Sequence, residues 1–288
     1  MRRLIVNADD FGLTPGVNKA VVALHQAGAL TSTTLMAAAP CYQEAVDLAQ
    51  QNASLGVGCH IVLVDGAPLS PPETIPTLLD PDSRVPAFRS TLGLFLQDLL
   101  LGRIRTQDIL LEATAQIQRL QSSGLTVTHC DTHKHTHMFP HVLEPVLRAA
   151  RQCGVRGVRN PFEPDWSVNA TPQANAMRRL EVQLLHNMYA QFFSKVRSYS
   201  MVTTDGCLGV VATGTLDAAT IGAILDRMPE GTWELVCHPA YVDAELRATR
   251  TRLIDSRMVE VEALLATLAR GNAKYADMLR ISYGNLTV

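Results

Sequence analysis

Short apolar runs rich in β-branched residues alternate along the chain with segments of helical periodicity. Seven runs predict buried strands, namely Leu4–Ala8, Thr31–Ala38, Leu55–Val64, Thr126–Asp131, Val155–Arg159, Leu208–Thr213 and Thr232–His238. Helices are predicted between them at Pro15–Ala27, Tyr42–Gln50, Gln107–Ser122, His141–Gln152, roughly Pro172–Val196 and Leu216–Arg227. Near-continuous apolar strands that alternate with helices are typical of a mainly parallel sheet. The pattern therefore predicts an α/β protein, with either an open doubly wound sheet or a closed or distorted barrel.

Two stretches interrupt this alternation. The longer, Asp65–Arg105, opens with a series of prolines, and we expect an ordered excursion over one face of the protein. Within it Leu94–Leu101 predicts a helix, with an apolar surface for a lipid-like ligand as the alternative. The shorter stretch, Asn160–Thr171, directly follows a predicted strand. Long loops in such positions are more often functional than decorative.

Composition narrows the classes of function. A chain of 288 residues with 47% hydrophobic content can bury one core, and we expect a single domain over residues 1–288. The formal charge is -2 and no basic stripe is present, so we expect no nucleic-acid partner. The first apolar run is too short for a signal peptide or a membrane span. We expect a cytoplasmic protein with no transmembrane segment, which leaves peripheral membrane contact and the oligomeric state open.

Side chains that suit a metal site stand at the carboxyl ends of four predicted strands. They are Asp9, Asp10, His60, Asp131, His133 and His238. Active sites of parallel α/β proteins lie at this edge of the sheet. Carboxylate oxygen and imidazole nitrogen together suit a borderline divalent ion, and three protein ligands leave positions open for water and substrate. The pattern predicts a catalytic metal site at the C-terminal strand ends.

Each of these signals also has a plainer interpretation. Asp9 and Asp10 precede a helix and could serve only its dipole; in an extended strand their side chains would diverge unless Phe11-Gly12 forms a turn. His238 could be structural or a general acid. Alternation places one row of side chains on a common side while the backbone stays extended, namely His129, Asp131, His133, His135 and His137. One ion cannot bind all of them, and a solvated histidine-rich loop is the alternative.

Five short motifs occur in a fixed order over nearly the whole chain: Asn7–Gly12, Thr31–Met36, Gly58–His60, Thr128–His133 and Cys237–Pro239. In these motifs the sequence resembles the YdjC-like carbohydrate deacetylases. Three further segments resemble most closely the hopanoid-biosynthesis-associated branch of that family. They are Val64–Pro68, Asp131–His135 and Arg159–Pro161 together with Glu163.

The resemblance implies a distorted (β/α) barrel and one divalent ion, Mg²⁺ or Zn²⁺, held by Asp10, His60 and His133. It also implies Asp9 as the catalytic base and hydrolysis of the acetyl group of an N-acetylated sugar or sugar-lipid. Lys134 stands where the family commonly has a histidine or glutamine.

The remaining polar residues of the motifs receive roles around this centre. With three ligands already assigned, we expect His238 to be the general acid rather than a fourth ligand. Four others are expected to contact the substrate or to support the ligands, namely Asp131, His135, His137 and Arg159.

Two other functions compete with metal-dependent deacetylation. A glycoside hydrolase would need a pair of carboxyl groups, such as Asp9 and Asp131, and no metal. That alternative explains neither His60 nor the histidine-rich segment. A non-catalytic sugar-binding or metal-storage protein is the third possibility, but two adjacent carboxylates with three remote histidines favour chemistry.

Overall fold

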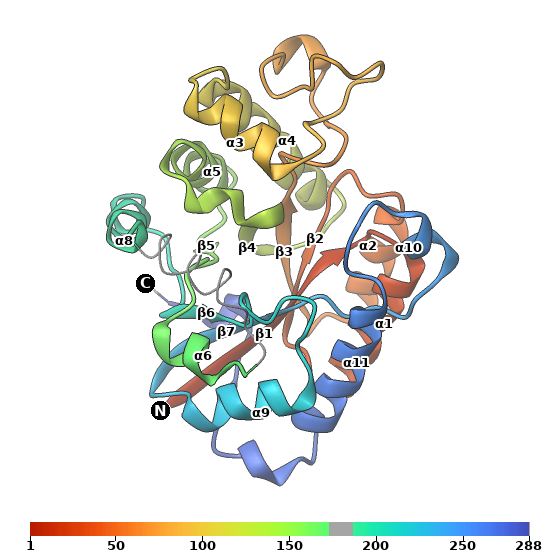
Figure 1. The fold of residues 1–288 in the computed structure, drawn as a ribbon, viewed down its shortest axis with the longest axis vertical. Coiled ribbons are helices and arrows are strands. Elements are labelled where there is room, and N and C mark those ends of the chain that lie inside the picture. The colour runs from red at the N-terminus through yellow and green to blue at the C-terminus, as the bar shows by residue number, and fades with distance from the viewer. Residues whose placement is uncertain (173–186, 288) are drawn as a thin grey trace.

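The computed structural model describes residues 1–172 and 187–287, and its centre is one parallel sheet curled into a half-barrel (Figure 1). The strands are β1 (Arg2–Phe11), β2 (Ser32–Leu35), β3 (Gly56–Ile61), β4 (Val127–Thr132), β5 (Gly157–Val158), β6 (Gly206–Leu208), β7 (Gly231–Cys237) and β8 (Leu279–Arg280). They lie in the order β5-β4-β3-β2-β1-β7-β6, and β8 pairs with β1. All pairings between these strands are parallel, so their carboxyl ends share one edge. The predicted distorted barrel is confirmed.

Irregular backbone connects the two outer strands, β5 and β6. The Val158 N–H donates to the Val202 carbonyl at 3.0 Å, and the Cys207 N–H donates to the Phe162 carbonyl at 3.0 Å. These bonds continue the curl of the sheet beyond its regular ladders. The segment that follows β5 is thereby held against β6, which places Arg159 inside the curl.

Helices surround the sheet on its outer side (Figure 1). The longer ones are α1 (Pro15–Gln26), α2 (Tyr42–Gln51), α4 (Thr106–Ser122), α5 (Pro140–Gln152), α8 (Tyr189–Ser198), α9 (Ala218–Arg227) and α11 (Asp255–Leu268). Shorter helical segments are α3 (Leu92–Leu100), α6 (Asp165–Ala170), α10 (Ala244–Ala248), η1 (Pro72–Thr74), η2 (His133–Met138), η3 (Ala273–Tyr275) and η4 (Tyr283–Asn285). None of the described helices is long and apolar enough to cross a membrane.

Strand β1 separates the apolar core from a polar interior. Leu4, Val6 and Ala8 belong to the core packed against the helices. Asn7 and Asp9 alternate with them, as the period of a strand requires, and are equally buried. They bond to His129 and Arg159 inside the curl. The barrel interior below the strand ends is therefore built from polar side chains.

The predicted strand Leu208–Thr213 is wrong beyond its first residue. Strand β6 ends at Leu208 because Gly209 adopts a left-handed φ of 86°. The buried Glu163 carboxylate then accepts the N–H groups of Gly209 and Val211 at 3.1 and 2.7 Å. A side chain here replaces the ladder that a longer strand would have formed.

The apolar pattern also failed to predict α10, α11 and β8. Helix α11 was missed because its buried face carries Arg257 and Glu260, which interrupt the apolar periodicity. The helix predicted at roughly Pro172–Val196 includes residues 173–186, which lie outside the described residues. The described part of that prediction overlaps α8, which continues to Ser198.

The excursion Asp65–Arg105 is ordered around its own apolar contacts. Leu78 and Phe95 are buried, and the helix predicted at Leu94–Leu101 is present as α3. The buried Arg89 guanidinium donates to two carbonyls and to Asp98. Figure 1 shows the excursion beyond α4, connected directly to the end of β3. It therefore begins at the edge of the sheet where the strands end.

We predict that Gly58→Ala destabilises the fold by about 1–3 kcal/mol, the usual cost of overpacking. A Cβ at Gly58 would meet the His129 ring at 2.5 Å. That ring cannot move away easily, because it is stacked on Tyr283 with centroids 3.9 Å apart. Urea unfolding of both proteins measures the change.

Gly222→Ala, at a position inside α9, is the matched control. A Cβ at Gly222 would meet the Tyr275 hydroxyl at 3.6 Å, which is an ordinary van der Waals contact. We expect it to be neutral or to stabilise by about 0.5–1 kcal/mol. Equal effects of the two substitutions would show that the His129 ring does not constrain Gly58.

Candidate metal centre

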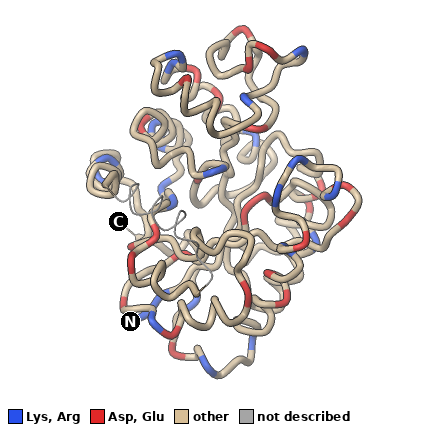
Figure 2. Tube along the Cα trace, viewed as in Figure 1, with Lys and Arg blue, Asp and Glu red and all other residues tan. Residues whose placement is uncertain are grey.

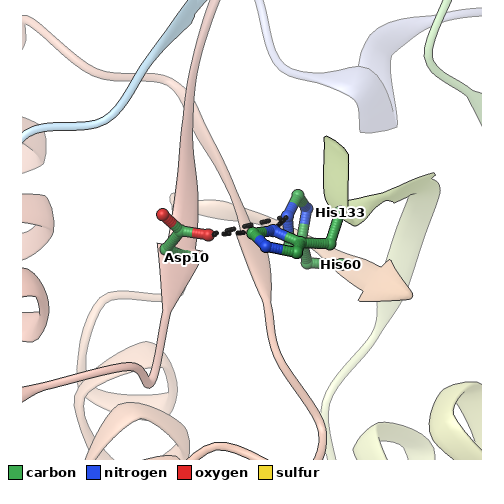
Figure 3. Close-up of side chains that lie close together, drawn as sticks. All are labelled: Asp10, His60 and His133. Carbon is green, nitrogen blue, oxygen red and sulfur yellow. Dashed lines mark hydrogen bonds and ion pairs between the residues drawn. The ribbon is translucent and has the colours of Figure 1, made fainter. Parts of the chain in front are cut away.

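The structure brings Asp10, His60 and His133 together at the ends of β1 and β3 and the start of η2 (Figure 3). Asp10 Oδ1 lies 3.6 Å from His60 Nε2 and 3.6 Å from His133 Nδ1, and the two nitrogens are 3.2 Å apart. Metal–ligand bonds of about 2.0–2.2 Å in a tetrahedron would separate ligand atoms by roughly 3.3–3.6 Å. The spacing and the donor types therefore fit one divalent ion.

The backbone at the end of β1 lets both carboxylates face this region. Asp10 adopts a left-handed φ of 65°, and the pairing of β1 with β2 shifts register between Ala8 and Phe11. The Leu13 N–H donates to the Asp10 carbonyl at 3.0 Å, which closes the turn. The turn thus starts at Asp10 itself, one residue earlier than the sequence suggested.

The histidine-rich segment does not form a common row of five side chains, because its backbone does not stay extended. The extended backbone ends at Thr132, and Lys134 and His135 adopt left-handed φ values of 57° and 52°. His137 turns inward instead, where it bonds to the Thr132 hydroxyl at 2.8 Å and the Arg159 carbonyl at 3.1 Å. Of the predicted row, His133 meets the Asp10 and His60 side chains.

His135 and His129 do not belong to the cluster of Asp10, His60 and His133. Burial lowers the pKa of both imidazoles to about 3, which keeps them neutral. His129 bonds to the Asn7 side chain below the centre at 3.2 Å. Nδ1 of His135 is a buried atom with no hydrogen-bond partner among the described residues.

Asp131 fixes the orientation of His60. Its Oδ1 lies 2.7 Å from His60 Nδ1, which leaves Nε2 of the ring facing Asp10 and His133. Burial alone would lower the pKa of His60, but the carboxylates of Asp131, Asp9 and Asp10 together outweigh it and raise that pKa to about 9. A carboxylate behind a ligating histidine is a common way to hold the ring and increase its basicity.

Arg159 is fully buried and contacts three carboxylates. Its guanidinium binds Asp9 through two nitrogens at 2.6 and 2.8 Å, Asp131 at 2.5 Å and Glu234 at 2.9 Å. Burial would raise the pKa of Asp9 and of Asp131, yet the guanidinium holds both below their usual range. At Glu234 burial outweighs Arg159 and raises the pKa to about 7.

His238 lies beside Asp9, with Nε2 3.8 Å from Asp9 Oδ2. The Glu260 carboxylate accepts its backbone N–H at 2.5 Å. Burial lowers the pKa of the imidazole from 6.5 to about 4. His238 is therefore neutral at pH 7, and any proton that it donates must first be delivered to it.

Sequence reasoning missed three charged residues that contact these groups: Glu234, Arg257 and Glu260. Glu234 left a signal, because it is a lone carboxylate inside the apolar strand β7. Arg257 binds Asp10 Oδ2 at 2.6 Å, and it shares the unpredicted helix α11 with Glu260. Arg257 and Glu260 are opposite charges three residues apart and lie on the buried face of α11. This spacing was the signal in the sequence that could have identified them.

The fold and the site define a (β/α)-barrel protein with a candidate metal centre at its strand ends. Residues 3–271 match the model of a family described as YdjC-like protein, and the chain belongs to this family.

Relatives and solved structures extend this result. The chain is 31% identical over 246 residues to a carbohydrate deacetylase of Thermoanaerobacter pseudethanolicus, covering 85% of this chain and 84% of the relative. It is 32% identical over 264 residues to a carbohydrate deacetylase of Geobacillus stearothermophilus, covering 91% and 89%. The crystal structure of a candidate cellobiose-phosphate cleavage protein from Enterococcus faecalis superposes with a TM-score of 0.77 at 26% identity, covering 100% and 99%.

We predict that raising the pH from 5 to 8 destabilises the native protein relative to the variant Glu234→Gln. The folded protein binds a proton at Glu234 more tightly than the unfolded chain, whose carboxyl has a pKa near 4.5. This stabilisation is present below pH 4.5 and is lost as the pH rises through about 7. The difference between the two proteins should grow by roughly 1–3 kcal/mol over that range.

Urea unfolding at pH 5, 6, 7 and 8 measures this difference. Glu262→Gln, at an exposed position of α11, serves as the control and should follow the native protein. A native protein that gains stability over the variant as the pH rises would show that Glu234 stays ionised against Arg159.

Proposed function

We propose that this protein is a metal-dependent carbohydrate deacetylase that hydrolyses the acetyl group of an N-acetylated sugar or sugar-lipid. The proposal rests on one observation above the others, the ligand-like spacing of Asp10, His60 and His133 with the Asp9 carboxylate beside them. Membership of the YdjC-like family and the relatives named carbohydrate deacetylases support it. Two nitrogen ligands favour zinc over magnesium.

A divalent cation held there would supply Lewis-acid polarisation of the amide carbonyl and would acidify a water molecule. Asp9 then acts as the base that accepts the proton of the attacking water. Because Arg159 lowers the pKa of Asp9, the proton is bound weakly and is readily passed on. His238 is the neighbouring acceptor and delivers the proton to the departing nitrogen. Water thus contributes its hydroxyl to the acyl carbon and its proton to the amine, giving acetate and a free amino sugar.

Two features of the loop after His133 support a role for it in binding the substrate. Lys134 binds the Asp65 carboxylate at 2.7 Å, which ties the loop after His133 to the start of the excursion. This contact gives Lys134 a structural purpose at the position where it departs from the family pattern. The buried and unpartnered Nδ1 of His135 supports a hydrogen bond to the substrate, since such an atom costs free energy when it has no partner.

We infer a sugar-lipid substrate of the hopanoid type from the segments that resemble that branch. Two of them, Val64–Pro68 and Asp131–His135, contain the residues of the Asp65–Lys134 ion pair. The excursion that begins there carries exposed leucines on α3, among them Leu94 and Leu100. An exposed apolar surface on this excursion suits a substrate that combines a sugar with a lipid.

The geometry disfavours a glycoside hydrolase. Asp131 is fully buried and already bonds to His60 and Arg159. Arg159 also holds the pKa of Asp131 below its usual range, so this carboxyl stays ionised and cannot protonate a leaving group. Asp9 without a second available carboxyl cannot form the pair that such hydrolysis requires.

The decisive test is acetate release from a panel of N-acetylated sugars and sugar-lipids. The zinc-loaded protein should release acetate, lose the activity after chelation and regain it with added Zn²⁺. Asp9→Asn should abolish release while circular dichroism and metal content stay near native, because an amide cannot accept the proton. Asp277→Asn, at an exposed carboxylate that binds Arg2, should keep native activity. No acetate from any substrate, with metal content verified, would refute the proposal.

We also predict that His238→Ala lowers kcat by about 10²–10⁴-fold, the usual contribution of a positioned acid or base. Metal content, measured by elemental analysis, should stay near native because the proposed ligands are three other residues. Loss of metal would make His238 a ligand instead. A small effect on both quantities would assign delivery of the proton to water or to Asp9 directly.

A further inference from the structure

Arg257 binds the Asp10 carboxylate from outside the three proposed ligands. Its guanidinium is buried and lies 2.6 Å from Asp10 Oδ2. The same group donates to the Leu253 carbonyl at 3.0 Å and to the His238 carbonyl at 3.4 Å. These three acceptors hold the guanidinium in one position, so the oxygen that it binds is held as well.

The two oxygens of Asp10 therefore have different neighbours. Oδ2 is engaged by Arg257, whereas Oδ1 points toward His60 and His133 (Figure 3). A carboxylate without the guanidinium could rotate and present both oxygens to one cation. We propose that Arg257 is a positioning residue that limits Asp10 to one coordinating oxygen and so keeps positions open for water and substrate. This inference rests on the proposed metal centre.

Helix α11 contacts the ends of both β1 and β7 at the carboxyl edge of the sheet. Three residues after Arg257, Glu260 accepts the backbone N–H of His238 at 2.5 Å. The Arg257 carbonyl also accepts the Ala240 N–H at 3.3 Å. The helix thus fixes Asp10 at the end of β1 and the segment after β7 at the same time. A purely structural ion pair would affect stability alone, whereas a positioning residue must also affect how the metal is bound.

The test compares Co²⁺ binding by the full-length native protein and by Arg257→Lys. Lysine keeps the positive charge but lacks the planar fork that reaches three acceptors. We expect Arg257→Lys to weaken Co²⁺ binding 10–100-fold in calorimetric titration, the usual effect of removing a group that orients a ligand. We also expect weaker d–d absorption, because a second oxygen from Asp10 raises the coordination number. Arg252→Lys, at an exposed arginine of the preceding loop, should match the native protein in both.

Native affinity and an unchanged spectrum in Arg257→Lys, with only lower stability, would overturn the inference and leave the proposed function intact. Native protein that binds no Co²⁺ would overturn both. If Arg257→Lys does not fold, X-ray absorption of the zinc-loaded native protein decides. One Asp10 oxygen at bonding distance supports the inference, and two such oxygens overturn it.

Discussion

The buried guanidinium of Arg159 is the interaction on which the centre of this protein depends. It joins carboxylates from β1, β4 and β7, namely Asp9, Asp131 and Glu234. Three carboxylates at such close range repel one another and lose their hydration when buried, so the strand ends could not approach without a cation between them. Loss of one member of a buried pair typically costs about 3–5 kcal/mol, because it leaves a charge uncompensated.

From Arg159 the order of the site spreads outward through hydrogen bonds. The Asp131 carboxylate orients the His60 ring through a hydrogen bond, and the Arg159 carbonyl accepts a hydrogen bond from the His137 ring. Below, the Tyr283 hydroxyl donates to Glu234, and the Tyr283 ring stacks on His129. The floor of the half-barrel is thus a connected polar layer. Because its charges are unevenly placed, neighbouring groups titrate differently: the pKa of Asp9 is lowered while that of Glu234 is raised.

Two arginines divide the adjacent carboxylates of β1 between two roles. Arg159 holds Asp9 toward His238, and Arg257 holds Asp10 with one oxygen toward His60. Consecutive residues of a strand normally point to opposite sides, so this division needs the left-handed backbone at Asp10. Elsewhere on the surface the charges are mixed: Figure 2 shows Lys and Arg scattered among Asp and Glu on the described residues, with no continuous basic stripe. The strand ends instead bring together buried charges, namely Arg159 and Arg257 with Asp9, Asp10, Asp131 and Glu234.

The sequence by itself determined the parallel α/β architecture, because strand and helix periods are local properties. It also indicated a group of acidic and histidine side chains at the strand ends, because parallel strands bring their carboxyl ends to one edge. The resemblance to the YdjC-like deacetylases then selected Asp10, His60 and His133 from this group as the expected ligands. It could not place His135 and His137, since left-handed residues after Thr132 end the alternation. Only the tertiary structure decided the partners of Asp9 and Asp10. Arg159 and Arg257 lie 150 and 247 residues away from them, and ion pairs formed by folding over such separations leave no periodic trace in the chain.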